Sequence, residues 1–248
     1  MKKLIFLPLL FIILHSNAQK FITSGTIEFE TKTNVPKTIT WDGAMSDEIK
    51  SKLPTFSTNY YTYTFNNDKS VYKFSRNTDK QKIPEWFKVA QEEDVSYNDY
   101  AAKTFVNRRE VQNDDIYLIT GTIKPIQWKI YPNDNTVIAG FNCRKAGTIM
   151  FDSVYIFAYY TDEIKISGGP MGLSGLPGMI LGVTIPRMHT SWIATSLQLS
   201  ADQSAITPPT RGKKTTEDQI KVSLNEMGKR WGKEGQKYLH PAIWKALL

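Results

Sequence analysis

Apolar and polar residues alternate over much of the chain. In residues 22–33, Ile27 and Phe29 fall on one side and acidic or hydroxyl residues on the other, which is the period of two of a half-buried strand. Residues 61–74 carry two such stretches around an Asn-Asn-Asp turn and predict a hairpin. From residue 103 onward the pattern recurs between turn-forming residues. We expect strands at residues 103–111, 116–123, 126–131, 136–143, 147–151, 154–160, 178–185 and 189–199.

These strands predict a mainly β fold, an antiparallel meander that forms a sandwich or a curved half-barrel. Residues 154–160 are apolar on both faces, so we expect them at the centre of the sheet. The connections between strands are too short for the crossover helices of a parallel sheet. Residues 76–100 are predicted to form a loop, and residues 132–135 a turn between two strands.

The tail of the chain has a different pattern. Residues 207–214 have the composition of a linker, and Thr216 then precedes Gln219 at the spacing of a capping box. Apolar residues follow at helical spacing and predict one amphipathic C-terminal helix, with the stripe Ile220, Leu224, Met227 and Trp231. The expected organisation is residues 1–18 as a signal peptide, residues 19–206 as a β-rich domain, and residues 207–248 as a linker and helical segment packed on it.

The beginning of the chain predicts export. Lys2 and Lys3 precede an apolar run at residues 4–14, and Ser16-Asn17-Ala18 offers small residues for cleavage after Ala18. The run is too short for a membrane span, which needs roughly 20 residues. No cysteine follows it, so we do not expect a lipoprotein, and no later segment predicts a transmembrane helix. The mature protein is therefore expected to be soluble and either periplasmic or extracellular.

The composition of the chain limits the partners and cofactors that we expect it to bind. The chain has 31 Lys and Arg against 24 Asp and Glu, a net charge of +7 that does not by itself indicate a nucleic-acid partner. Cys143 is the only cysteine, so no intrachain disulfide can form, and we expect it to pack as a small strand residue. His189 and His240 lie far apart without metal-ligand spacing, so neither a metal nor another cofactor is predicted.

A glycine- and proline-rich segment at residues 168–178 is the first candidate for chemistry. It lacks the Gly-Lys-Ser/Thr of a phosphate loop, and Ser174 lacks the second glycine of a nucleophile elbow. Pro177-Gly178 fits the centre of a type II turn. We therefore expect a structural bend, with a hydrolase built on Ser174 or on the acidic clusters as a weaker alternative.

Several runs resemble the GLPGLI family of exported bacterial proteins, whose activity is uncharacterised. They are Trp128-Lys129-Ile130, Phe141-Asn142-Cys143-Arg144-Lys145-Ala146, Ala158-Tyr159-Tyr160-Thr161-Asp162-Glu163-Ile164, Gly169-Pro170 and Gly175-Leu176-Pro177-Gly178-Met179-Ile180-Leu181. The resemblance implies an accessory role beside a TonB-dependent outer-membrane receptor. It transfers no catalytic residues.

The leading hypothesis is thus a non-enzymatic binding or accessory protein of the cell envelope. Its expected ligand or partner face consists of Gly169, Pro170, Gly175, Leu176, Pro177, Gly178, Cys143 and Lys145. The alternative is a carrier that holds an apolar or peptide ligand in a half-barrel cavity, favoured by the aromatic residues Tyr61, Tyr63, Tyr155 and Phe157. The sequence predicts no oligomeric state.

Overall fold

The structure is a computed structural model. It describes residues 22–39, 43–78, 91–111, 115–151, 153–199, 206–230 and 232–248. The predicted signal peptide lies outside these residues. Within them, no helix has both the length and the apolar character needed to cross a bilayer.

Strands make up most of the fold. They are β1 (Gly25–Asn34), β2 (Phe56–Phe65), β3 (Lys69–Asn77), β4 (Val95–Asp99), β5 (Thr104–Val111), β6 (Asp115–Thr122), β7 (Lys129–Ile138), β8 (Phe141–Met150), β9 (Val154–Thr161), β10 (Met179–Ile185), β11 (Thr190–Gln198) and β12 (Lys213–Thr215). The helices are α1 (Ala44–Lys52), α2 (Glu217–Arg230) and α3 (Gly232–Leu247), with 3-10 turns η1 (Pro36–Thr38), η2 (Pro170–Gly172) and η3 (Pro186–Met188).

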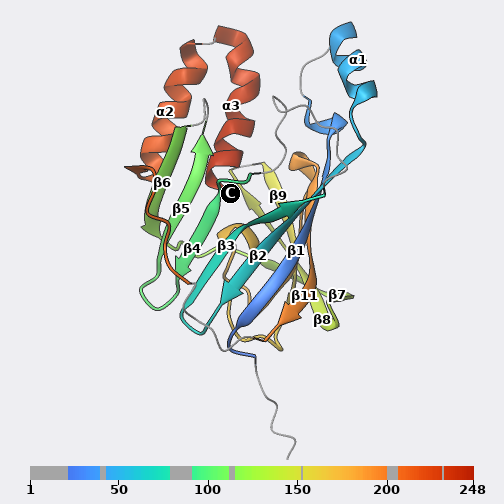
Figure 1. The fold of residues 1–248 in the computed structure, drawn as a ribbon, viewed down its shortest axis with the longest axis vertical. Helices are drawn as coiled ribbons and strands as arrows, with labels where there is room; N and C mark the ends of the chain where they lie inside the picture. Colours follow the sequence, from blue (N-terminus) through green and yellow to red (C-terminus); the bar gives the residue numbers. More distant parts are fainter. Residues whose placement is uncertain are drawn as a thin grey trace, which may run out of the picture.

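All strands belong to one open sheet in the order β12-β6-β5-β4-β3-β2-β1-β11-β10-β9-β8-β7. Neighbours pair antiparallel, except that β12 runs parallel to β6. Strands β1 and β11 join the two halves of the chain at the middle of the sheet. The sheet curls so that β7 to β9 lie behind β1 to β4, and α2 and α3 stand at one end (Figure 1). The predicted mainly β fold with a C-terminal helix is confirmed, in the form of a single curved sheet.

Three parts of the strand prediction were wrong. Strand β9, expected at the centre of the sheet, is the third strand from one edge, and Tyr155 on its outer face is 55% exposed. Strand β4 lies inside the predicted loop 76–100. The sequence pattern did not reveal this strand, because its buried residues include the polar Ser96 and Asn98, which do not look like core residues. The turn expected at residues 132–135 is a bulge within β7, and the hairpin turns instead at Ala139-Gly140, where both residues have positive φ. A bulge absorbs extra residues without ending the strand pairing.

The C-terminal helix begins as the sequence predicts. The Thr216 hydroxyl accepts from the Gln219 N–H at 3.3 Å, and the Gln219 side chain accepts from the Thr216 N–H at 3.0 Å, which is a reciprocal capping box. Ile220 and Leu224 are buried among Phe105, Ile119 and Leu239, while Trp231 lies outside the described residues. A second helix, α3, follows and packs against α2 and β5.

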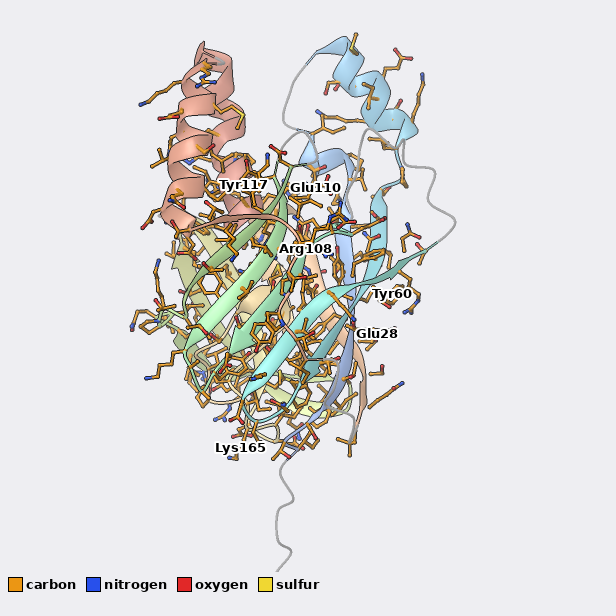
Figure 2. The ribbon with its side chains drawn as sticks, turned by 60° about the vertical axis from the view of Figure 1, so that its left-hand side comes forward. Glu28, Tyr60, Arg108, Glu110, Tyr117 and Lys165 are labelled. Carbon is orange, nitrogen blue, oxygen red and sulfur yellow. The ribbon has the colours of Figure 1, made fainter. Side chains whose placement is uncertain are left out.

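The core fills the concave side of the sheet. Its largest fully buried side chains include Ile27, Phe29, Tyr63, Phe65, Ile156 and Tyr160. The glycine- and proline-rich segment crosses this interior, since η2 contacts β3, β4 and β10. Lys165, just before it, lies at the end of the sheet away from α2 and α3 (Figure 2). The segment therefore runs from that end through the core toward the helices.

Glycines allow this passage. A Cβ on Gly168 would overlap the hydroxyls of Tyr63 and Tyr100, which are hydrogen-bonded to each other at 2.9 Å. Gly178 has φ +151°, and a Cβ there would overlap the carbonyl oxygen of Thr161. The turn at Gly178 is tighter than the predicted type II turn, because its own N–H donates to the Leu176 carbonyl at 2.7 Å.

Candidate functional site

A cavity of about 270 Å³ opens at the helical end of the curved sheet. Its walls come from the inward faces of β1 to β5 and β11, from η1 and η3, and from the last turns of α3. We call it the end cavity. The C-terminal end of the chain lies close to the middle of the molecule (Figure 1), so α3 delivers Trp244 and Leu248 into this wall.

A buried ion pair forms part of the wall. Arg109 is 3% exposed, and its Nε lies 3.8 Å from Asp94 Oδ2. Its Nη2 donates to Ser96 Oγ at 2.9 Å and to a main-chain oxygen of Leu248 at 3.1 Å, while Asp94 accepts from the Glu110 N–H at 2.9 Å. Burial raises the pKa of the Asp94 carboxyl, and the Arg109 charge opposes that shift. The pair therefore ties β4, β5 and α3 together.

Two other polar groups in the wall, the hydroxyls of Thr31 and Tyr72, form no such bonds with the described residues. Thr31 and Tyr72 are each 5% exposed and both line the end cavity. Among the residues that the structure describes, neither Thr31 Oγ1 nor Tyr72 Oη has a hydrogen-bond partner. Tyr72 Oη lies close enough to the Thr31 and Trp192 side chains for both to lower its pKa slightly, but neither contact has the geometry of a full hydrogen bond. We call these two groups the cavity hydroxyls.

The cavity hydroxyls stand out against their neighbours. Thr33 lies two residues beyond Thr31 on the same face of β1 and is equally buried, but its hydroxyl shares a hydrogen bond of 3.0 Å with the Thr190 hydroxyl. A buried polar group left without a partner costs about 1–3 kcal/mol. Burial also raises the pKa of Tyr72 well above its usual range, so the phenol stays protonated as a donor. These two atoms are therefore available to a ligand.

Aromatic rings line the same space. The Tyr61 and Tyr72 rings are stacked, with centroids 5.1 Å apart and 10° between their planes. The Arg187 guanidinium lies 5.3 Å from the centre of the Trp244 ring, a cation–π distance. Burial raises the pKa of Tyr61 to about 12, and its hydroxyl accepts from the Gln91 N–H at 3.2 Å. The walls thus suit a ligand with a flat or apolar part.

Charge at the end cavity is mostly positive. Lys37, Arg187 and Lys245 join Arg109 in the lining, against Asp94 as the one carboxylate side chain among the lining residues. Within the described part of the chain, Lys37 and Lys245 form no ion pair at salt-bridge distance. Burial lowers the pKa of His189 and the charge of Lys37 lowers it further. An anionic group would therefore be attracted to this cavity.

Among the described residues that line the end cavity, Ser96, His189 and Asp94 do not form a hydrogen-bonded Ser-His-Asp arrangement. Ser96, His189 and Asp94 all line it, but Ser96 Oγ accepts from Arg109 and Asp94 pairs with the same arginine. Ser174 is buried elsewhere, with its carbonyl accepting from Trp128 Nε1 at 2.9 Å. The described residues contain no group of three or more His, Cys, Asp or Glu that could hold a metal ion.

The structure does not bring the sequence-predicted face together. Gly169, Pro170, Leu176 and Gly178 are buried, Gly175 and Pro177 are exposed, and none of the six lines the end cavity. The glycine- and proline-rich segment to which they belong contributes Met171 instead. Cys143 is 1% exposed and, as expected, packs as a strand residue, with burial raising its pKa to about 11. A binding role for these residues stays a prediction.

Lys145 lies on the outer face of the sheet. It forms an ion pair with Asp134 at 3.0 Å and approaches the rings of Tyr131 and Phe157. The aromatic residues expected in a carrier cavity are also divided, because Tyr61 lines the end cavity, Tyr63 is buried in the core, and Tyr155 and Phe157 line a shallow outer depression.

Charged and aromatic side chains also pair with one another around Tyr60 on the outer face. The Arg76 guanidinium lies 3.9 Å above the Tyr60 ring and bonds to Glu28, which lies near Tyr60 on this face (Figure 2). The Tyr60 hydroxyl in turn donates to Glu30 at 3.0 Å.

Of the residues that line the end cavity, the sequence analysis had singled out only Tyr61 as a cavity residue, although a signal for others was present. Thr31 continues the inward series of Ile27 and Phe29, and Arg109 continues the inward series of Phe105 and Val111. A polar residue at a position that the alternation assigns to the core is a candidate site residue. The rest of the cavity depends on α3 and η3, whose positions no local pattern predicts.

Comparison with known proteins gives one family and one fold. Residues 61–182, just under half of the chain, match the family Porph_ging, described as a protein of unknown function. Among solved structures, the chain is similar to PNGF-II in space group P21 (TM-score 0.51) and in C2 (TM-score 0.52), both at 16% identity. Each match covers 81% of this chain but 33% and 32% of those chains. The comparison with curated proteins finds no significant match.

The chain thus spans about a third of the length of the PNGF-II structures, and at this identity the likeness shows the fold alone. The resemblance to the GLPGLI family was wrong, since the family that matches is Porph_ging. The Gly-Leu-Pro-Gly run on which it relied meets a local need, a turn at Gly178 with no room for a side chain. A short motif of this kind reports backbone geometry and does not by itself identify a family.

Proposed function

We propose that the chain is an exported, non-enzymatic binding protein that holds a small anionic ligand in its end cavity. The observation that carries the proposal is the pair of buried cavity hydroxyls on Thr31 and Tyr72 facing this space. Export is proposed from the basic, apolar and small residues at positions 2–18. The accessory role beside an outer-membrane receptor was implied only by the resemblance to the GLPGLI family, which the match to Porph_ging overturns, so that role is not part of the proposal.

Charge and shape support an anionic ligand. Lys37, Arg187 and Lys245 give the cavity a positive potential, and the arginine of the buried pair is already bonded by protein groups. The Tyr72 phenol is a donor that an anionic oxygen accepts well, because hydrogen bonds to charged groups are worth about 1.5–3 kcal/mol. The stacked rings of Tyr61 and Tyr72 offer an apolar wall beside it.

Fluorescence titration with anilinonaphthalene sulfonate, an aromatic anion, tests the proposal. We expect saturable binding that weakens about tenfold in Tyr72→Phe and severalfold in Lys245→Gln, because each change removes one contact to the anion. Lys214→Gln is the matched control, since Lys214 is exposed and does not line the cavity. Absence of saturable binding, or equal affinity in all three variants, would contradict the proposal.

A further inference from the structure

A second cavity lies next to the end cavity. It has a volume of about 430 Å³ and is reached between the β6–β7 connection, the end of β8 and the C-terminus of α3. Met171 and Leu248 line both cavities, so these two residues form the partition between them.

The two cavities differ in chemistry. More than half of the residues that line the second cavity are apolar, among them Phe105, Ile123, Ile126, Phe151, Leu173 and Leu247. Lys124, Glu217 and Lys221 are also in its lining. Lys124 and Glu217 neutralise each other in an ion pair of 2.7 Å, and Lys221 lies 3.9 Å from Asp218. The end cavity instead carries more cationic side chains and the cavity hydroxyls. The end cavity, with more cations and with two unbonded hydroxyls, thus lies beside a cavity with fewer charged groups.

The partition can move at low cost. Met171 has an unbranched, flexible side chain that adapts to the shape of its surroundings. Its backbone has φ +58°, a left-handed conformation that costs a non-glycine residue roughly 1–2 kcal/mol. Gly172 follows with φ +80°, so two consecutive residues at this turn have a left-handed backbone conformation. Rotation of the Met171 side chain is the simplest way to connect the cavities.

We infer that the ligand is an amphiphile whose anionic head group lies in the end cavity and whose alkyl chain passes Met171 into the second cavity. This inference rests on the proposed function and specifies its ligand class. The head group is satisfied by the Tyr72 and Thr31 hydroxyls and by the surrounding cations. The chain buries apolar surface against Leu173, Ile126 and their neighbours.

Isothermal titration calorimetry with two alkyl carboxylates, hexanoate and dodecanoate below its micelle concentration, tests the inference. Each buried methylene is worth about 0.8 kcal/mol, so we expect the six additional methylenes of dodecanoate, about 5 kcal/mol when all are buried, to make it bind roughly a thousandfold or more tighter than hexanoate. Ile126→Trp or Gln127→Trp, which fill the second cavity from its loop wall, should reduce this ratio at least tenfold and leave hexanoate affinity unchanged. Ile130→Trp is the matched control, because Ile130 is exposed and lines neither cavity.

The outcomes separate the two proposals. Equal affinity for both carboxylates, weakened by Tyr72→Phe, would overturn the amphiphile and leave the small-anion function intact. Dodecanoate binding that neither Tyr72→Phe nor the second-cavity variants affect would place the ligand elsewhere and overturn the inference. Failure of both carboxylates and of anilinonaphthalene sulfonate to bind would overturn the proposed function itself.

Discussion

Removing the Tyr72 hydroxyl should stabilise the ligand-free protein. In Tyr72→Phe the ring keeps its stacking on Tyr61 at 5.1 Å and its edge contact with Phe29 at 6.2 Å, so packing is retained. What disappears is a buried phenol oxygen that has no partner among the described residues. Such a group costs about 1–3 kcal/mol in the folded state. We therefore expect the free energy of unfolding to rise by about 1 kcal/mol.

Tyr63→Phe is the matched control. Tyr63 is 1% exposed on the neighbouring strand, but its hydroxyl shares a hydrogen bond of 2.9 Å with the Tyr100 hydroxyl. The same atom is deleted in both variants, and only its bonding differs. Tyr63→Phe should lower the free energy of unfolding by about 0.5–1.5 kcal/mol, although Tyr100 retains its bond of 3.0 Å to Ser70.

Urea denaturation of ligand-free protein, followed by circular dichroism, measures both changes. In a thermal melt of a chain of this size, a change of 1 kcal/mol in the free energy of unfolding corresponds to a shift of about 2–4 °C in Tm, upward for Tyr72→Phe and downward for Tyr63→Phe. Thr31→Val and Thr33→Val repeat the comparison, because the Thr33 hydroxyl is bonded to Thr190 and the Thr31 hydroxyl faces the cavity. Destabilisation by Tyr72→Phe as large as that by Tyr63→Phe would refute the reasoning, since it would mean that the Tyr72 hydroxyl is bonded in the free protein.

Three further predictions concern the interior. Gly178→Ala should destabilise the fold by about 2–5 kcal/mol in urea denaturation, because its Cβ overlaps backbone, whereas Gly140→Ala meets open space and should cost only the backbone strain of about 1–2 kcal/mol. Arg109→Met should lower the free energy of unfolding by about 3–5 kcal/mol, because it leaves the buried Asp94 carboxylate unpaired. The loss should be smaller at about pH 5 than at about pH 8, because burial raises the pKa of Asp94 and protonation at the lower pH removes the unpaired charge. Cys143 should resist alkylation until the chain unfolds, because it is buried and its pKa of about 11 leaves little thiolate; rapid labelling of the native protein would contradict this burial.

Much of the fold follows from alternation in the sequence. Strands with regular alternation, such as β1 and β11, lie close to their predicted positions, because one buried face fixes where their apolar residues must fall. Strand β4 escaped prediction because Ser96 and Asn98 occupy buried positions. Strand β12 is only three residues long and pairs with β6 from a segment with the composition of a linker, a long-range contact that no local pattern encodes.

The candidate site was less predictable than the fold. The glycine- and proline-rich segment attracts attention in the sequence, yet its glycines serve close packing against Tyr63, Tyr100 and Thr161. The residues of the end cavity look ordinary in the sequence, because a threonine or a tyrosine in a strand is common. Only the curl of the sheet and the approach of α3 leave the Thr31 and Tyr72 hydroxyls buried against an open space.

A crystal structure of the protein with dodecanoate would test the central claim most directly. We predict the carboxylate within hydrogen-bond distance of the Tyr72 hydroxyl, with the alkyl chain extending past Met171 toward Leu173. An end cavity filled only by water, with dodecanoate bound instead to the outer surface at Tyr155 and Phe157, would contradict the account.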